Sequence, residues 1–454
     1  MKQNHKTKFK QTEIGMIPED WEVATIDQIK SDKKHALAMG PFGSNITKDN
    51  FIDHGVPVIR GNNLTEFRFL DRDFVFVNES KAERLKASEA KRQDIVVTHR
   101  GTLGQVAIIP SDSRYQKYIV SQSGMKLTCD TSRVNPYFVF YFLKSPAGQY
   151  LLLKNTSQTG VPAIAQPLSS LKQVPIPLPQ LPEQNAIVNL FSSLDDKIEL
   201  NQQMNNTLEK IGQALFKHWF GNFEFPDEKG KPYKSSGGEM VDSELGKIPK
   251  GWRIATLREY ITIERGLSYK GSGLTDYGLP MINLANIAPN HGFIYAGIKP
   301  YSGEYKERNI VRVGDIVIAN TDITQKRDVL GSPAIVPDLG SEKILFTHHI
   351  YAVRNKSWIP NIFIYYLLQL KEYENRTRGF ATGTTVLFLP EDAILDFQLA
   401  LPNKELVENF VSIIQKHIDK SEINNSESQR LSQLRNSLLP KLMSGKIRVN
   451  MEAS

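Results

Sequence analysis

The chain has 454 residues, a formal net charge of +7 and one cysteine, Cys129. A single cysteine excludes an internal disulfide and a zinc site built from several cysteines, and it fits a reducing compartment. No apolar run reaches the roughly 18 residues of a membrane span, and the polar first residues lack the apolar stretch of a signal peptide. We therefore expect a cytoplasmic protein of about two to four domains whose charge suits a polyanionic partner without proving one.

The sequence contains a long internal repeat. Residues 13–26 and 244–257 share seven identical positions, including Trp21 and Trp252. Solenoid repeats recur every 20–50 residues, so a repeat of this length indicates a duplicated domain. Two similar domains suit a molecule that reads two similar things. Further matches pair 55–59 with 278–282, 94–96 with 315–317, 159–160 with 382–383, and 181–182 with 401–402.

Each half begins with short β-branched and aromatic runs broken by Gly, Asn and Asp, which is the pattern of strands. A helix is predicted after the strands of each half, at Pro136 and at Pro360, because proline at a helix start costs no hydrogen bond. We expect the aromatic residues of these two helices to pack in the cores. The predicted strands include 74–77, 95–97, 105–109, 315–318 and 350–353.

A long polar stretch with sparse apolar residues follows each domain. One row of residues recurs every seventh position, and a second row lies three positions further on, which is the heptad pattern of a coiled coil. The alternative is two separate amphipathic surface helices. The first rows are Ile187, Leu194, Asn201, Leu208 and Leu215, and Phe410, His417, Asn424, Leu431 and Leu438; the second rows include Leu190, Met204, Ile211, Ile413 and Leu434.

The predicted fold is α+β, with two tandem, similar α/β domains, each followed by a long helix. The two helices are expected to pair as an antiparallel coiled coil with pseudo-twofold symmetry, and Asn201 and Asn424 are expected to fix its register. A helix of about 40 residues spans about 60 Å, which exceeds one DNA turn of about 34 Å. The predicted segments are a basic arm 1–12, a first domain 13–179, a helix 180–220, a linker 221–242, a second domain 243–402, a helix 403–445 and a tail 446–454.

The motifs of an enzyme are missing. The run 135–138 lacks the second proline of the Asn-Pro-Pro-aromatic motif of amino-methyltransferases, and the glycines at 271 and 273 are too few for a nucleotide-binding turn. His348 and His349 are expected to point to opposite faces of a strand, which disfavours shared metal ligation. We therefore predict no catalytic residue, no metal site and no cofactor on this chain.

Loops rich in Arg, Lys, Asn, Gln, Ser and Thr recur at corresponding places in the two halves. Such side chains bind phosphates and base edges, although each loop alone is compatible with an ordinary solvated surface. Lys326 and Arg327 are interpreted as the second-half equivalents of Arg60 and Arg100. The candidate DNA-binding residues are Ser44, Asn45, Arg60, Asn62, Arg100, Thr102, Gln158 and Thr159 in the first half, and Lys270, Asn283, Gln325, Lys326, Arg327, Arg376 and Arg378 in the second.

The order of these motifs resembles that of the specificity subunits of type I restriction-modification systems. The resemblance covers nearly the whole chain. The second half departs from it, because Asn403 stands after Leu401-Pro402 where Glu183 follows Leu181-Pro182. The residues that carry it are 17–18 with Trp21, 40–44, 55–61, 181–184, 216–220 and 434–442.

The resemblance implies a non-catalytic subunit with two target recognition domains, each reading one half of a bipartite, asymmetric site in double-stranded DNA. It also implies docking of two modification subunits that methylate adenine with S-adenosylmethionine and, optionally, of restriction subunits that use ATP and Mg²⁺. The rows of the two helices would serve helix pairing and subunit docking. Two other interpretations stay open: a stand-alone DNA-binding regulator, and a self-contained methyltransferase.

Overall fold

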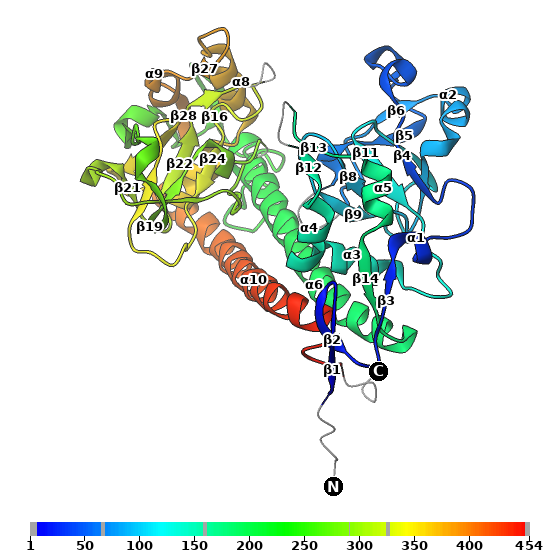
Figure 1. The fold of residues 1–454 in the computed structure, drawn as a ribbon. Coiled ribbons are helices and arrows are strands. Elements are labelled where there is room, and N and C mark those ends of the chain that lie inside the picture. Colours follow the sequence, from blue (N-terminus) through cyan, green and yellow to red (C-terminus); the bar gives the residue numbers. More distant parts are fainter. Residues whose placement is uncertain (1–6, 65–68, 158–160, 290, 324–326, 450–454) are drawn as a thin grey trace. The chain divides into compact units, whose positions relative to one another are not determined.

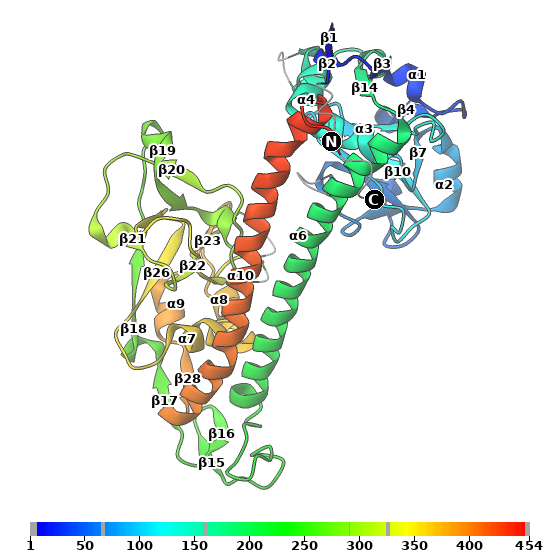
Figure 2. The ribbon, with the colours of Figure 1, turned by 90° about the horizontal axis from the view of Figure 1, so that it is seen from below.

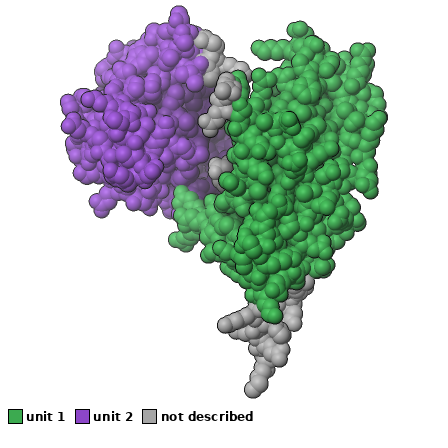
Figure 3. All heavy atoms as spheres, in the orientation of Figure 1, with its two compact units in different colours: residues 1–200, 427–454 green, residues 201–426 purple. Residues whose placement is uncertain are grey.

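The computed structural model describes residues 7–64, 69–157, 161–289, 291–323 and 327–449 (Figure 1). The chain divides into two compact units, which are coloured separately in Figure 3. The first unit comprises residues 1–200 and 427–454, and the second comprises residues 201–426. Among the described residues, no helix is both long and apolar enough to cross a membrane.

The first unit is built around two four-stranded sheets, with strand orders β6-β5-β10-β7 and β4-β11-β8-β9. The pairing of β10 with β5 is parallel, and the other pairings in these sheets are antiparallel. The chain passes from one sheet to the other between β10 and β11. The strands are β4 (Leu37–Met39), β5 (Val56–Ile59), β6 (Val75–Val77), β7 (Glu89–Lys91), β8 (Ile95–Thr98), β9 (Val106–Ile108), β10 (Lys117–Val120) and β11 (Gly124–Leu127).

Shorter elements complete the first unit. The hairpin of β1 and β2 lies partly inside the predicted basic arm, and β3 pairs with β14 directly before the first long helix. These elements are β1 (Phe9–Thr12), β2 (Gly15–Pro18), β3 (Glu22–Thr25), α1 (Ile26–Ile29), α2 (Glu79–Arg84), α3 (Pro136–Lys144), α4 (Pro146–Leu153), β12 (Thr156–Ser157), β13 (Ala163–Ile164), α5 (Pro167–Lys172) and β14 (Pro175–Leu178).

The second unit repeats this arrangement, with four-stranded sheets ordered β20-β19-β25-β21 and β18-β26-β22-β24. The predicted α+β class with two similar tandem domains is therefore confirmed. Its elements are β15 (Met240–Ser243), β16 (Gly246–Pro249), β17 (Arg253–Thr256), β18 (Ile261–Arg265), β19 (Leu274–Ile282), β20 (Lys299–Tyr301), β21 (Ile310–Val311), β22 (Ile316–Ala319), β23 (Thr321–Asp322), β24 (Pro333–Ile335), β25 (Ile344–Phe346), β26 (Ile350–Asn355), α7 (Asn361–Leu367), α8 (Lys371–Gly379), β27 (Leu387–Phe388), α9 (Glu391–Leu395) and β28 (Gln398–Leu401).

The proline-initiated helices form where they were predicted. Helix α3 starts at Pro136, and the Asn135 side chain caps it by accepting a hydrogen bond from the Tyr137 N–H (2.9 Å). Helix α7 starts directly after Pro360. The predicted aromatic residues of both helices are buried, so their role in the cores is confirmed.

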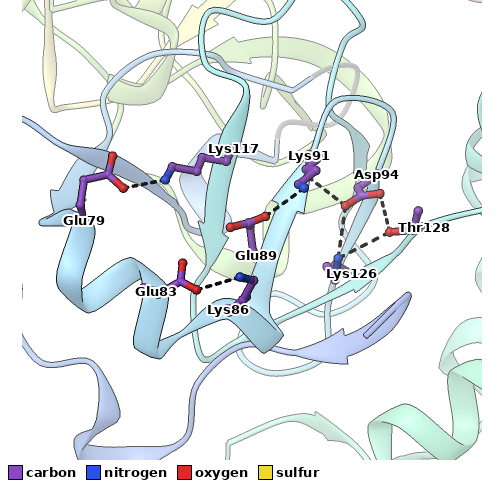
Figure 4. A network of polar contacts seen from close by, with 9 residues as sticks. All are labelled: Glu79, Glu83, Lys86, Glu89, Lys91, Asp94, Lys117, Lys126 and Thr128. Atoms are coloured by element: carbon purple, nitrogen blue, oxygen red, sulfur yellow. Dashed lines mark hydrogen bonds and ion pairs between the residues drawn. The ribbon is translucent and has the colours of Figure 1, made fainter. Parts of the chain in front are cut away.

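The repeated runs 94–96 and 315–317 each begin with an aspartate whose carboxylate bonds to other strands and loops of its unit. Asp94 accepts hydrogen bonds from the Thr128 hydroxyl (2.6 Å) and the Lys91 N–H (2.9 Å), and its carboxylate lies 3.5 Å from the Lys126 ammonium (Figure 4). Burial raises the pKa of Asp94. In the second unit Asp315 pairs instead with Arg354, at 3.3 Å. The repeat thus keeps the carboxylate and changes the cation.

Two long helices, α6 (Leu181–Phe216) and α10 (Lys404–Met443), lie side by side (Figure 2). In the first unit Asp195 pairs with Arg435 at 2.6 Å and Lys197 pairs with Glu427 at 3.2 Å. Partner numbers in α10 fall as those in α6 rise, so the helices are antiparallel. The expected pairing of the two helices therefore holds, and the alternative of two separate surface helices is wrong.

The first heptad row lies in the helix seam, and Leu190 and Met204 of the predicted second row are half-buried, but its other three named residues are exposed and wrongly placed. Ile211, Ile413 and Leu434 are 45%, 39% and 46% exposed. The second row lies four positions after the first, not three, and includes polar or small residues that a hydrophobic pattern does not reveal. Within the first row Ile187, Leu194, Asn201, Phe410 and Asn424 are buried, and Leu208, Leu215, His417, Leu431 and Leu438 are half-buried; the second row includes Phe191, Ile198, Asn205, Gly212, Ile414, Ser421, Ser428 and Arg435.

Asparagines form a polar layer in the part of the seam that belongs to the second unit. The Asn201 amide donates to the Asn424 carbonyl (3.3 Å), and the Asn424 amide donates to the Asn205 side chain (2.8 Å). Asn205 in turn donates to the Asn425 side chain (2.7 Å). A buried polar group is costly in any register that separates it from its partners, so this layer favours one alignment of the helices.

The segment predicted as a linker contains a packed corner. The Phe225 ring stacks on Tyr233 and on Trp252, with centroid distances of 4.6 and 5.4 Å. Strand β15 falls at its end and pairs with β16. In the predicted tail, Arg448 pairs with Asp20 at 2.9 Å. The linker and residues 446–449 of the tail are therefore packed parts of their units.

In each unit, tyrosine hydroxyls donate hydrogen bonds to a carboxylate of helix α6. In the first unit the Tyr141 hydroxyl donates to Asp195 (2.8 Å), which also pairs with Arg435. In the second unit the hydroxyls of Tyr365 and Tyr366 donate to Glu209 (3.0 and 3.3 Å). Burial raises the pKa of Glu209 despite these hydrogen bonds.

The stability of the protein should depend on the ionisation of Glu209. Because its pKa is higher in the folded than in the unfolded state, where it is about 4.3, the folded state binds the proton more tightly. The free energy of unfolding should therefore decrease as pH rises from the unfolded to the folded pKa, and stay low above it. Glu209→Gln should remove this decrease and be the more stable protein at high pH.

Urea unfolding of wild type and Glu209→Gln between pH 4 and pH 8 measures this effect, with Glu408→Gln on the exposed face of α10 as the control. The same pH dependence in wild type and Glu209→Gln would contradict the prediction.

Candidate nucleic-acid interface

A three-residue turn, 121–123, carries the first unit's chain from β10 to β11 and thus from one sheet to the other. We call it, with its second-unit counterpart 347–349, the crossing turn. The Ser121 N–H donates to the Ile59 carbonyl (2.9 Å), and the His99 N–H donates to the Ser123 carbonyl (2.9 Å). These bonds bring the ends of β5 and β8 to the turn. Arg60 and Arg100, the residues that follow those two bonded positions, therefore lie at one edge.

A glycine packs directly on the same turn. The Gly40 N–H donates to the Gly124 carbonyl (2.9 Å), and a Cβ at position 40 would lie 1.8 Å from the Ser121 carbonyl oxygen. Any other residue would collide with the main chain there. The 40–44 motif therefore has a structural cause, and it delivers the exposed Ser44 and Asn45 to the same edge.

The second unit builds the same edge. The Thr347 N–H donates to the Ile282 carbonyl (2.9 Å), and the Asn320 N–H donates to the His349 carbonyl (3.1 Å). A Cβ at Gly266 would lie 2.3 Å from the Thr347 carbonyl oxygen. Gly266 thus takes the place of Gly40.

This correspondence corrects one interpretation of the sequence. The residue after Ile282 is Asn283, and the residue after Asn320 is Thr321, so these two are the counterparts of Arg60 and Arg100. Lys326 and Arg327 are not. The error arose because the comparison matched charge, whereas the two halves share the backbone and differ in the side chains it presents.

The arginines of the first edge differ in availability. Arg100 is exposed, and its main chain bridges to Ala163. The Arg60 side chain is half-buried and donates to the Asp73 carbonyl (3.4 Å). Arg100 is therefore the better placed of the two to meet an external anion. Other exposed candidates at or near the strand ends are Asn62, Thr102 and Lys270.

Two buried asparagines that the sequence reading assigned no separate role hold the loops of the edge in shape. Asn63 accepts from the Arg60 N–H (3.0 Å) and donates to the carbonyls of Leu70 and Arg72 (3.2 and 2.8 Å). Asn286 makes the corresponding bonds, accepting from the Asn283 N–H (2.9 Å). This repeat of structure was visible in the sequence, because Asn63 lies three residues after Arg60 and Asn286 lies three residues after Asn283.

Three predicted DNA-binding arginines already have partners within the second unit. Arg376 donates to the Ala393 carbonyl (2.8 Å), and Arg378 pairs with Glu374 on the same helix α8 (2.5 Å). Arg327 donates to the Arg378 carbonyl (2.6 Å). Asn283 likewise donates to the Gly297 carbonyl (2.9 Å). The candidates Gln158, Thr159, Gln325 and Lys326 lie outside the described residues.

The rings of the adjacent histidines in the second crossing turn lie close together and tilted. The rings of His348 and His349 are 3.9 Å apart, so the expectation that they point to opposite faces of a strand is wrong. They occupy a turn, where the alternation of a strand does not apply. Burial, followed by the neighbouring His348 and Arg265, lowers the pKa of His349. Among the described residues, no group of three potential metal ligands is found.

An open cleft of about 1060 Å³ borders the second crossing turn. His348 and Arg265 line it together with Lys306 and Arg308. Glu264, Glu304 and Glu391 line it as well, so the cleft has mixed charge. Such a surface suits a ligand that offers both hydrogen-bond donors and acceptors.

The chain is similar to a known family model and to several known proteins. A family model described as "Type I restriction modification DNA specificity domain" matches residues 18–210. The MjaIX type I restriction enzyme specificity subunit of Methanocaldococcus jannaschii is 26% identical, over 98% of this chain and 97% of the relative. This chain is therefore similar to type I restriction enzyme specificity subunits. The MjaVIII specificity subunit of the same organism is 24% identical, over 97% of this chain and 96% of its own.

A crystal structure of the S subunit of a type I restriction-modification system from M. genitalium is 17% identical, covers 97% of this chain and 98% of its own, and has a TM-score of 0.49. The relatives are named as specificity subunits, which agrees with the resemblance that the sequence motifs predicted.

The motif at 181–184, which carries part of the family resemblance, anchors the start of α6 in the first unit. The Trp21 indole N–H donates to the Glu183 carboxylate (3.0 Å), which also accepts from Arg448 (2.7 Å). In the second half Asn403 instead caps its helix by accepting from the Leu406 N–H (2.9 Å). The sequence departure at this corner therefore changes the contacts.

The steric role of Gly266 can be tested with a matched pair. A Cβ at Gly266 would meet main-chain atoms, whereas one at Gly271 would meet nothing within 4 Å. We expect Gly266→Ala to lower the free energy of unfolding by about 1–3 kcal/mol and Gly271→Ala to change it by less than about 0.5 kcal/mol. Urea unfolding measures both values. Equal free energies of unfolding for the two variants would contradict the prediction, because the crossing turn would then shift to admit the Cβ without loss of stability.

Proposed function

We propose that this chain is the DNA-recognition subunit of a type I restriction-modification complex and that each unit reads one half of a bipartite site. The observation that carries the proposal is the repeated edge: the same backbone arrangement surrounds the crossing turn in both units. The similarity of residues 18–210 to a DNA specificity domain supports the choice of DNA as the ligand.

The target should be asymmetric. Asn283 and Thr321 of the second edge occupy the positions that correspond to Arg60 and Arg100 of the first. An arginine pairs best with guanine or phosphate, whereas asparagine pairs best with adenine. Unlike side chains on a like backbone therefore favour unlike half-sites.

The long helices are suited to set the spacing between the half-sites. Helix α6 has 36 residues and α10 has 40, so at about 1.5 Å per residue each is about 54–60 Å long. This exceeds the roughly 34 Å of one DNA turn. The asparagine layer supports a fixed register, which a spacer needs.

We further propose that two modification subunits, which bind S-adenosylmethionine, dock on this chain, together with restriction subunits that use ATP and Mg²⁺. The buried first rows serve helix pairing, so docking needs other residues. Helix α6 exposes Leu200 (49%) and Ile211 (45%), and α10 exposes Ile423 (61%) and Leu434 (46%). In each helix the two residues are eleven positions apart, about three turns, and so share a face. This matched exposure supports two similar partners.

Mapping of methylated adenine in cells tests the proposal. Cells that express this chain with its modification subunit are compared with cells that lack only this chain. We expect a split, asymmetric motif only when the chain is present. Methylation that does not change on its removal would contradict the proposal, and tight specific DNA binding without partners would favour a stand-alone regulator.

Replacing Arg100 should affect one half-site only. Loss of a guanine contact costs about 1–3 kcal/mol of binding free energy, so Arg100→Ala should weaken or relax the half-site read by the first unit and leave the other unchanged. The control is Arg84→Ala, which removes an exposed arginine on α2. Binding to duplexes with single base-pair changes gives the result. Unchanged affinity and preference would remove Arg100 from the interface.

A further inference from the structure

The crossing turn is the central element of each edge. In the first unit it is bonded to Ile59, which precedes Arg60, and to His99, which precedes Arg100. The loops that sequence singled out and that the structure brings to this edge thus begin beside it. Neither turn was among the predicted DNA-binding loops: Ser-Gln-Ser matches no motif, and His348 and His349 were considered only as metal ligands.

The first crossing turn presents one free polar side chain from a fixed main chain. Gln122 is exposed, and its carboxamide makes no hydrogen bond with any described residue. The Ser121 and Ser123 hydroxyls on either side lie 3.3 Å apart and can bond to each other. The Gln122 carbonyl accepts from the His99 ring (3.1 Å), which fixes the main chain beneath the carboxamide.

The second crossing turn holds polar atoms that the described part of the chain does not satisfy. Thr347 is 1% exposed and Asn320 is 0% exposed, yet the hydroxyl of the first and the side-chain carbonyl of the second have no hydrogen-bond partner. The Nδ1 atom of His348 is in the same state. Leaving buried polar atoms unpaired is costly, so bound water is favoured here.

We propose that the crossing turn carries the base-reading side chains of both units, Gln122 in the first and His348 in the second. This inference rests on the proposed function. A carboxamide pairs with both N6 and N7 of adenine in the major groove, whereas the His348 imidazole, which lines the open cleft, offers a ring nitrogen and hence a different pattern. One rigid turn with two different side chains thus reads two different bases.

The rigidity of the turn supports the assignment of Gln122 and His348 as base-reading residues. A base-reading side chain discriminates only if its backbone cannot shift to accommodate the wrong base. In both units a glycine touches the turn on one side, and strand ends are bonded to it on the others. Loops such as Gly43–Asn45 lack this support and fit phosphate contact better.

The test measures binding of the complete complex with its modification subunits to duplexes that vary each base pair of the mapped site. With Gln122→Ala, we expect the affinity for the original site to fall about 10- to 100-fold. The penalties for wrong bases should collapse at one or two adjacent positions of one half-site and persist in the other. Gln173→Ala, an exposed glutamine of the same unit, should change nothing.

His348→Gln should move the effect to the other half-site. Gln122→Asn, which keeps the amide and shortens its reach, serves if Gln122→Ala proves unstable in thermal unfolding. Base preferences that are unchanged at every position, or a uniform loss of affinity for all sequences, would overturn the inference. If the wild-type complex shows no split motif, the proposed function itself is wrong. If the wild type shows a split motif and every turn variant keeps the same base preferences, only the assignment of Gln122 and His348 is wrong.

Discussion

The contact of a glycine with the crossing turn is the constraint on which each recognition edge depends. A Cβ at Gly40 or Gly266 would lie 1.8 or 2.3 Å from a carbonyl oxygen of the turn, far inside van der Waals contact. The turn is also where the chain leaves one sheet for the other. A steric constraint between main chains therefore fixes the edge, and it acts whatever side chains the turn carries.

This arrangement separates the framework from the surface that varies. Asn63 and Asn286 make corresponding hydrogen bonds, and Asp94 and Asp315 both sit at the start of a central strand. At the edge itself, by contrast, the side chains of the two units differ at almost every equivalent position. A duplicated domain can change what it reads in this way without rebuilding its core.

Sequence periodicity predicted much of the fold, but it could not locate the edge. The helices at Pro136 and Pro360 and the first row of the seam follow from local rules. The second row was missed because Gly212 and Arg435 are not hydrophobic, and the histidine pair was misjudged because a turn looked like a strand. Gln122 could not be found at all, since only the pairing of distant strands makes it central.

The seam shows why those missed residues matter. Gly212 and Arg435 each lie eleven residues after the seam asparagines, Asn201 and Asn424. At Gly212 a Cβ would collide with the Tyr366 hydroxyl, which bonds to Glu209; at the matching place Arg435 neutralises Asp195. Exchanging the two would leave one carboxylate without its cation and drive a bulky cation into a tyrosine. The two helices are therefore not interchangeable despite their common heptad pattern.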